Sequence, residues 1–344
     1  MDFGIFVPFH RMDESGSTPA LYEQALEQVR LADAAGIRIA WFPEHHLVHY
    51  YSCPSPLMFA VRAAAATRRI RLGTAILVIP YYNPLRLAGE LGMADILTDG
   101  RLEIGVGRGA FEYEFDRFGI DEHVGAARLR EGMEIIHGLL TQDDFAYSGE
   151  TIRFGPATAV PKPLQRPHPP IWVAARSPET IKWAAQHGYD LLATPWREPF
   201  SRVEFLHGNV QRIVDDVRPA KRPRFAVSRM TFVADTYEAA LNGMRPIQTS
   251  HRIFTKLFRN QATVKGGFTK VEPVEDEFSP EQLLANLVAG TPDMVVEKLR
   301  QYEALGVDHF IVYGAVGNEH ATTMRSLTLF AERVMPHFRQ GGRS

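Results

Sequence analysis

Two histidines and a glutamate stand together at the end of a short apolar segment, in the run Trp41-Phe42-Pro43-Glu44-His45-His46. A histidine beside a carboxylate can act as a general acid or base, because imidazole titrates near neutral pH. These residues and His49 could instead ligate a metal. Adjacent residues of an extended chain point to opposite faces, however, so His45 and His46 would not converge on one ion. The pattern favours acid–base catalysis by Glu44, His45 and His46 over purely structural histidines, and it predicts no metal site.

A glycine-rich run, Gly105-Val106-Gly107-Arg108-Gly109-Ala110, formally matches the G-x-G-x-x-A fingerprint of dinucleotide sites. That fingerprint needs a long helix to begin at once, but the aromatic segment 111–115 leads to Gly119 instead. We therefore interpret the glycines as positions where the backbone can approach a flat ligand, with Arg108 as an anion contact. A tight turn with Arg108 in a salt bridge is the alternative.

The run Ala175-Arg176-Ser177-Pro178-Glu179-Thr180 predicts the start of a helix, with Ser177 as N-cap and Pro178 in the first turn. Free N–H groups at such a position bind anions, and Arg176 adds positive charge. A capped helix without any ligand would have the same sequence. Together with Arg108, the run suggests one phosphate held by two loops.

The elements that position these residues alternate between short apolar strands and amphipathic helices. Such alternation indicates parallel strands with helical crossovers. Eight such units predict an α/β fold, a closed (β/α)₈ TIM barrel, in which active-site residues follow the strands. An open doubly wound sheet is the alternative. The eight predicted strands are 3–9, 39–43, 71–79, 101–107, 171–175, 191–194, 224–233 and 309–313.

Three stretches exceed what a barrel needs, and long excursions of this kind are often functional loops. They are 109–125 after strand four, 145–170 before strand five, with a hairpin around Ser148-Gly149-Glu150, and 266–280 after strand seven. We expect a single domain over residues 1–344, with a mobile lid at about 260–285.

Composition narrows the class of protein. The 344 residues are 45% hydrophobic and 23% charged, and 38 Lys and Arg against 40 Asp and Glu give a net charge of −2. This balance argues against nucleic-acid binding and against a polybasic membrane patch. The lone Cys53 permits no internal disulfide, and the longest apolar stretch, 72–82, is too short to span a bilayer. We expect a cytoplasmic enzyme.

Taken in order, these features resemble the luciferase-like flavin-dependent monooxygenases, specifically the bacterial luciferase (alkanal monooxygenase) branch. The resemblance implies a barrel that binds FMN, received in reduced form from a separate flavin reductase, and it implies a homodimer. The matching segments are 1–4, 41–46, 72–80, 99–101, 107–109, 183–185, 290–292 and 334–336.

Carried onto this sequence, the resemblance makes His45 the catalytic histidine, with Glu44 and His46 beside it. It also places a cis peptide bond at Ala75–Ile76 under the flavin ring. Gly107 stands where luciferase has a cysteine near the flavin, which suggests a relative that does not emit light. The implied cofactor-binding residues are Ala75, Ile76, Arg108, Ala110, Arg128, Ala175, Arg176, Ser177 and Thr180.

The resulting hypothesis is two-component monooxygenation, in which reduced FMN and O₂ oxygenate a small apolar substrate through a C4a-peroxyflavin. The substrate is expected to be an aldehyde or other carbonyl compound, with Phe111, Tyr113 and Phe115 at the mouth of the site. A deazaflavin-dependent hydride-transfer oxidoreductase and a non-catalytic flavin-binding subunit are the alternatives.

Overall fold

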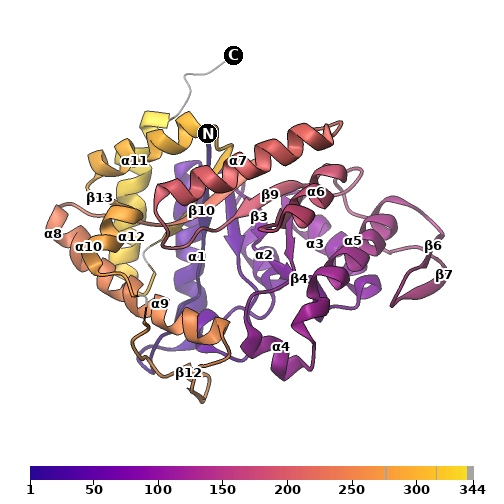
Figure 1. The fold of residues 1–344 in the computed structure, drawn as a ribbon, viewed down its shortest axis with the longest axis horizontal. Helices are drawn as coiled ribbons and strands as arrows, with labels where there is room; N and C mark the ends of the chain where they lie inside the picture. Colours follow the sequence, from indigo (N-terminus) through magenta and orange to yellow (C-terminus); the bar gives the residue numbers. More distant parts are fainter. Residues whose placement is uncertain (276, 315, 339–344) are drawn as a thin grey trace.

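Eight parallel strands close into a barrel in the computed structural model, which describes residues 1–275, 277–314 and 316–338 (Figure 1). Strand β10 pairs with both β9 and β14, and β14 pairs with β1, so the sheet has no open edge in the barrel. The predicted TIM barrel is therefore confirmed and the open sheet is excluded. The barrel strands are β1 (Asp2–Phe6), β2 (Ile39–Phe42), β3 (Arg71–Thr74), β5 (Leu102–Gly107), β8 (Ile171–Ala174), β9 (Asp190–Ala193), β10 (Phe225–Val233) and β14 (His309–Gly314).

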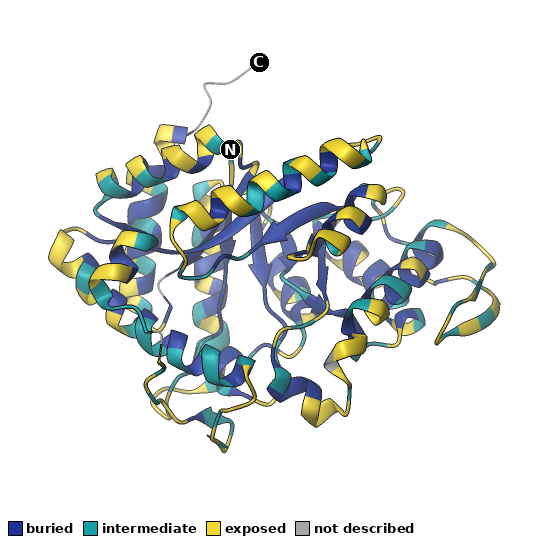
Figure 2. Cartoon of the chain, viewed as in Figure 1, coloured by how far each residue is buried: buried dark blue, intermediate teal, exposed yellow. Residues whose placement is uncertain are grey.

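The helices surround the barrel, with their exposed faces outward and the strands buried (Figure 2). Local signals set their ends. For example, Asn83 caps α3 by accepting the N–H groups of Leu85 and Arg86. The helices are α1 (Thr18–Ala35), α2 (Pro56–Ala64), α3 (Pro84–Leu97), α4 (Glu112–Phe118), α5 (Gly125–Thr141), α6 (Pro178–Gln186), α7 (Phe200–Val217), α8 (Tyr237–Asn242), α9 (Met244–Phe258), α10 (Pro280–Asn286), α11 (Pro292–Leu305) and α12 (His320–Leu329).

Two strand predictions need correction, and one strand was missed. The first strand ends at Phe6 rather than at residue 9, because Phe9 adopts a φ of 52°, which no strand contains. The strand predicted over 71–79 is divided into β3 and β4 (Leu77–Val78) by a cis peptide bond at Ala75–Ile76. A short strand, β13 (Val288–Gly290), pairs with the end of β10 and was not predicted.

The predicted excursions take different forms. The hairpin before strand five is confirmed, as β6 (Phe145–Ser148) paired antiparallel with β7 (Arg153–Ala157). The stretch after strand seven contains a second, unpredicted hairpin, β11 (Val264–Lys265) with β12 (Phe268–Thr269). Within the predicted lid, residue 276 lies outside the described residues, as do residues 315 and 339–344 of the predicted domain. No helix of the described residues is both long and apolar enough to cross a membrane.

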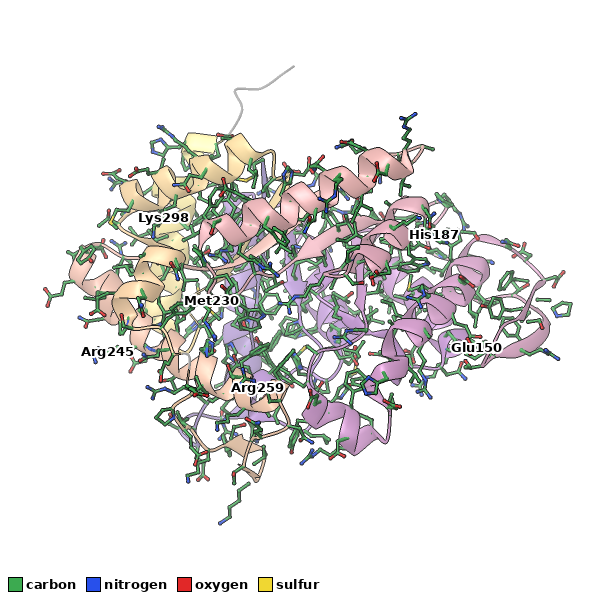
Figure 3. The ribbon with its side chains drawn as sticks, viewed as in Figure 1. Glu150, His187, Met230, Arg245, Arg259 and Lys298 are labelled. Atoms are coloured by element: carbon green, nitrogen blue, oxygen red, sulfur yellow. The ribbon has the colours of Figure 1, made fainter. Side chains whose placement is uncertain are left out.

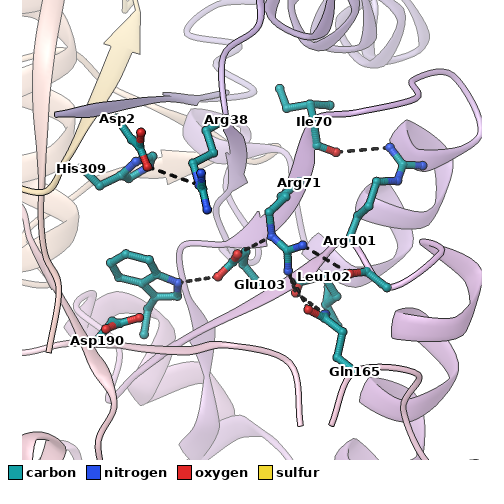
Figure 4. A network of polar contacts seen from close by, with 12 residues as sticks. Asp2, Arg38, Ile70, Arg71, Arg101, Leu102, Glu103, Gln165, Asp190 and His309 are labelled. Carbon is teal, nitrogen blue, oxygen red and sulfur yellow. Dashed lines mark hydrogen bonds and ion pairs between the residues drawn. The ribbon is translucent and has the colours of Figure 1, made fainter. Parts of the chain in front are cut away.

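Large side chains fill the barrel against glycines. A Cβ atom on Gly73 would lie 2.3 Å from the Trp41 ring, so only glycine fits beside it. Trp41 donates from Nε1 to Nε2 of His309 across 3.1 Å. At the opposite end of the barrel from the predicted site, Glu103 pairs with Arg71 in a buried polar network (Figure 4). This packing holds the strand ends in a fixed arrangement.

Candidate active site

A cavity of about 510 Å³ opens at the carboxyl ends of the barrel strands. Its volume lies within the range of ~300–1,000 Å³ that is usual for ligand sites. A larger polar cavity, of about 660 Å³, lies at the other end of the barrel. Barrel enzymes carry their chemistry at the carboxyl ends of the strands, so the smaller cavity is the candidate site. The hairpin bearing Glu150 lies far from the barrel centre, where Met230 is found, and takes no part in it (Figure 3).

His45 lines the cavity and is held on three sides. Its ring stacks between Tyr51, at 4.5 Å, and Phe111, at 4.2 Å. Its Nδ1 lies 3.0 Å from Oε1 of Glu114, which is fully buried on α4. An ionised carboxylate can only accept, so we assign the proton to Nδ1 and leave the Nε2 lone pair of His45 available as a base.

His46 points elsewhere, as the alternation of side chains predicted. Its Nε2 lies 2.9 Å from Oε1 of Glu44, and its ring packs edge-on against Phe118. Burial opposes charge on His46, but the hydrogen bond and charge of Glu44 outweigh it and raise the pKa of His46. Burial also raises the pKa of Glu44, which lines the cavity and accepts the N–H of Val78. The structure thus separates the two histidines.

Positive charge collects on one side of the cavity. Arg108 and Arg176 both line it, together with Ser177 and Thr180 at the start of α6. Arg176 keeps contact with solvent. Partial removal of its guanidinium from water nevertheless lowers its pKa, and the charges of Arg202 and Arg108 lower the pKa further. A cluster of like charges beside a helix N-terminus is suited to an anion.

Arg128 is the exception among the predicted cofactor residues. It is exposed on α5 and is not among the residues that line the cavity, although Leu129 is. The other predicted residues without charge, Ala75, Ile76, Ala110 and Ala175, do line it.

Apolar residues line another part of the cavity. Ala75 and Ile76 are joined by the cis peptide bond, and we call them the cavity floor. A Cβ atom on Gly107 would lie 2.3 Å from Cδ1 of Ile76, so a side chain at this position would push the end of the Ile76 side chain aside. The charged and apolar lining residues therefore fit a cofactor that has an anionic phosphate and an apolar ring, as flavins have.

Several site residues have no signal in the local sequence. Glu114 supports His45 from 69 residues away, and Tyr51 contacts Tyr313 across 262 residues. The aromatic residues at the mouth are also different from those expected. Phe111, Tyr113 and Phe115 are buried and do not line the cavity, because α4 packs them inward. The aromatic lining comes instead from Phe6, Tyr51, Trp196, Phe254, Phe258 and Tyr313.

Within the described ranges, no group of three or more His, Cys, Asp or Glu side chains could hold a metal ion. The polar groups of the cavity are those of acid–base chemistry and anion binding.

Comparisons with known proteins agree with this geometry. The sequence model of a family described as luciferase-like monooxygenase matches residues 1–309. The oxygenase component of a flavin-dependent trigonelline monooxygenase from Acinetobacter baylyi is 33% identical over 98% of this chain and 96% of that protein. A limonene 1,2-monooxygenase from Rhodococcus erythropolis is 29% identical over 98% of this chain and 87% of that protein.

Among solved structures, a monooxygenase from Streptomyces bottropensis has a TM-score of 0.85 and 27% identity. The match covers 98% of this chain and all of that one. The shared barrel, the family match along most of the chain and the full-length relatives lead to one conclusion. The chain belongs to the luciferase-like monooxygenase family and is an oxidoreductase.

Proposed function

We propose that this chain is the oxygenase of a two-component system that takes reduced FMN from a separate flavin reductase. With O₂, it oxygenates a small apolar organic substrate, an aldehyde or other carbonyl compound. One observation carries the proposal: the same cavity holds a cluster of cationic groups, an apolar floor and a histidine oriented by a buried carboxylate. The trigonelline relative, whose name describes an oxygenase component, supports the dependence on a partner reductase.

The cofactor would lie along the cavity floor. Arg108, Arg176, Ser177 and Thr180 would bind its phosphate, while the flat part would rest on Ala75 and Ile76. Ala110 and Ala175 would contact its stem. Arg128 would contribute only longer-range attraction, because its side chain is exposed outside the cavity. When bound, reduced FMN supplies the reaction with O₂, which no protein side chain provides.

The residues of the chain would hold and move protons. His45 Nε2 would accept a proton at the cavity wall and later return it, while Glu114 stabilises the charged imidazole from the other side. Glu44 and His46 form a second hydrogen-bonded pair behind this wall and would fix the loop that carries His45.

Water must be excluded from such a site. Trp196, Phe254 and Phe258 provide an apolar boundary. The segment 260–285 would act as the lid, since its hairpin lies over the loop that follows β2. There the His49 N–H donates to the carbonyl of Gly267 across 2.8 Å.

The phosphate contact tests the proposal. Arg176→Gln should raise the Kd for reduced FMN about 10- to 100-fold, since a hydrogen bond to a charged group contributes about 1.5–3 kcal/mol. Anaerobic titration followed by flavin absorbance measures this. Arg153→Gln, an exposed arginine on the β6–β7 hairpin, is the matched control and should leave the Kd unchanged.

The same titration separates the alternatives. Tighter binding of a deazaflavin with a longer anionic tail would favour the hydride-transfer alternative. The extra positive charge of Arg176 would contribute to binding such a tail. Tight binding of FMN without turnover of any substrate would favour a non-catalytic subunit. Absence of FMN binding would exclude the proposal.

A further inference from the structure

A row of aromatic side chains connects the cavity wall to a backbone carbonyl behind it. Tyr51 and Tyr313 both line the cavity, and their hydroxyls are hydrogen-bonded to each other. The Tyr313 hydroxyl also lies 3.3 Å from Nε2 of His10. On its other side, Nδ1 of His10 contacts the carbonyl oxygen of Tyr50. Nothing in the proposed chemistry so far uses this row.

The direction of every hydrogen bond in the row follows from its last member. A carbonyl oxygen only accepts, so Nδ1 of His10 carries the proton and donates to Tyr50. In a neutral ring Nε2 is then an acceptor, and the Tyr313 hydroxyl must donate to it. The proton of Tyr313 is thereby used, so the bond between the tyrosines must run from the Tyr51 hydroxyl to the Tyr313 oxygen.

The only arrangement that reverses this direction is a His10 cation, which would donate from both nitrogens. Burial lowers the pKa of His10 to about 3. The hydrogen bond to the Tyr50 carbonyl raises this pKa by a smaller amount, and charge on His45 lowers it slightly further. His10 is therefore neutral at physiological pH, and the row has one direction.

The consequence appears at the cavity wall. The Tyr51 hydroxyl donates its proton to the hydrogen bond with Tyr313 and also accepts one from the Tyr50 hydroxyl, so toward a ligand it offers its remaining lone pair and no donor. His45, stacked on Tyr51, has likewise given its Nδ1 proton to Glu114 and presents Nε2 as an acceptor. We call Tyr51 Oη and His45 Nε2 the accepting wall. Ser228 also lines the cavity, but its hydroxyl can donate or accept and does not discriminate.

We propose that the accepting wall selects substrates that carry a hydroxyl or N–H donor on an apolar or aromatic body. A ligand that turns a carbonyl toward this wall leaves lone pairs facing lone pairs, whereas a donor completes the row. The reactive carbonyl of a substrate would then face away from Tyr51, and the apolar body would contact Trp196, Phe254 and Phe258. This inference rests on the proposed function only in taking the cavity as the substrate site.

A matched pair of probes tests the inference. Benzyl alcohol and benzaldehyde are nearly equal in size, but only the alcohol donates a hydrogen bond. Binding to the protein loaded with oxidised FMN, measured by calorimetry, should favour benzyl alcohol about 3- to 10-fold, as one net hydrogen bond contributes about 0.5–1.5 kcal/mol. Equal affinity, preference for benzaldehyde or failure of benzyl alcohol to bind would overturn it.

Two variants distinguish direction from simple polarity. Tyr313→Phe frees the Tyr51 hydroxyl to donate into the cavity, so the preference should vanish or turn toward benzaldehyde. Tyr51→Phe removes the acceptor and should also reduce the preference, whereas Ser228→Ala should retain it. Persistence of the full preference in both tyrosine variants would contradict the proposal.

A readout without flavin or substrate checks the row itself. Nitrogen-15 NMR of the apo protein should show His10 as the neutral tautomer protonated at Nδ1, and a tautomer protonated at Nε2 would overturn the inference even if a variant fails to fold. If FMN binds but the probes show no preference, this inference fails alone. If FMN does not bind, the proposed function fails, and the tautomer still decides the direction of the row.

Discussion

At the scale of single residues, the site depends on groups that orient other groups. His45 is fixed by two aromatic rings and by Glu114, a carboxylate with no solvent contact. Glu114 also accepts the backbone N–H of His46 across 2.7 Å, so one side chain holds both the His45 ring and the loop that carries it. Substitution of Glu114 should therefore slow the reaction strongly, although Glu114 does not itself line the cavity.

Glu114→Gln tests this dependence. An amide can donate to Nδ1 of His45 and so favour the wrong tautomer, and kcat should fall about 100-fold, the lower part of the range for lost acid–base catalysis. The Kd for FMN should not change. Glu112→Gln, on the same helix but partly exposed, is the control.

His45→Ala should lose turnover while keeping FMN binding. An unchanged kcat in both the Glu114 and the His45 variant would show that the two residues have only a structural role.

Residues with local signals could be located from the sequence, and those defined by tertiary contacts could not. His45, Arg108 and Ser177 follow predicted strands, and they line one cavity as barrel geometry requires. Glu114 and Tyr313 reach the site from distant segments. The aromatic run around Glu114 has the same composition whether its rings face the cavity or the core, and here they face the core. Arg128, assigned by resemblance, faces solvent instead.

At the scale of elements, neighbouring strands are linked to one another at their amino ends, which lie opposite the site. These links hold the carboxyl ends of the strands, and so the site, in place. Glu103 on β5 pairs with Arg71 on β3 and accepts the Trp172 Nε1–H of β8 across 2.7 Å, linking three neighbouring strands (Figure 4). Glu103 is almost fully buried, so loss of its carboxylate leaves two donors unsatisfied.

Glu103→Leu should accordingly lower the free energy of unfolding by about 3 kcal/mol, as expected when one partner of a buried ion pair is removed. Urea denaturation measures this. Glu90→Leu breaks an exposed pair with Arg86 on α3 and should change stability by no more than about 0.5 kcal/mol. Equal effects of the two substitutions would show that the network does not bind the strands together.

The order of the barrel strands and helices was predictable because short, mostly apolar segments alternate with helical patterns along the sequence. Strand ends and additions were not. The three-residue β13 is too short to form a pattern. The division between β3 and β4 coincides with the cis peptide bond at Ala75–Ile76, which only the family resemblance predicted and which the structure confirms.

At the scale of the whole molecule, exposed apolar side chains gather on α3 and the segment beside it. Met93, Ile96 and Leu97 lie on one side of α3 and are exposed, and Val160 and Leu164 are exposed in the segment that packs against Gly92 of the same helix. Exposed apolar side chains gathered in this way mark interfaces between proteins. We propose that a second copy of the chain covers them in a homodimer.

The double substitution Met93→Glu and Leu97→Glu should convert this dimer to a monomer in sedimentation velocity, because it places charges in an apolar contact. FMN binding should persist, since neither residue lines the cavity. Tyr237→Glu, at an equally exposed position on α8, should leave the dimer intact. A monomeric native protein would exclude the proposed interface.

We propose that the whole barrel serves to bind reduced FMN and direct its reaction with O₂. Rapid mixing of the anaerobic complex of protein and reduced FMN with O₂ tests it most directly. We predict that oxidised flavin absorbance returns more slowly than with free reduced FMN, and that labelled oxygen from O₂ enters an added aldehyde. Reoxidation at the rate of free flavin, with no labelled product, would contradict the account.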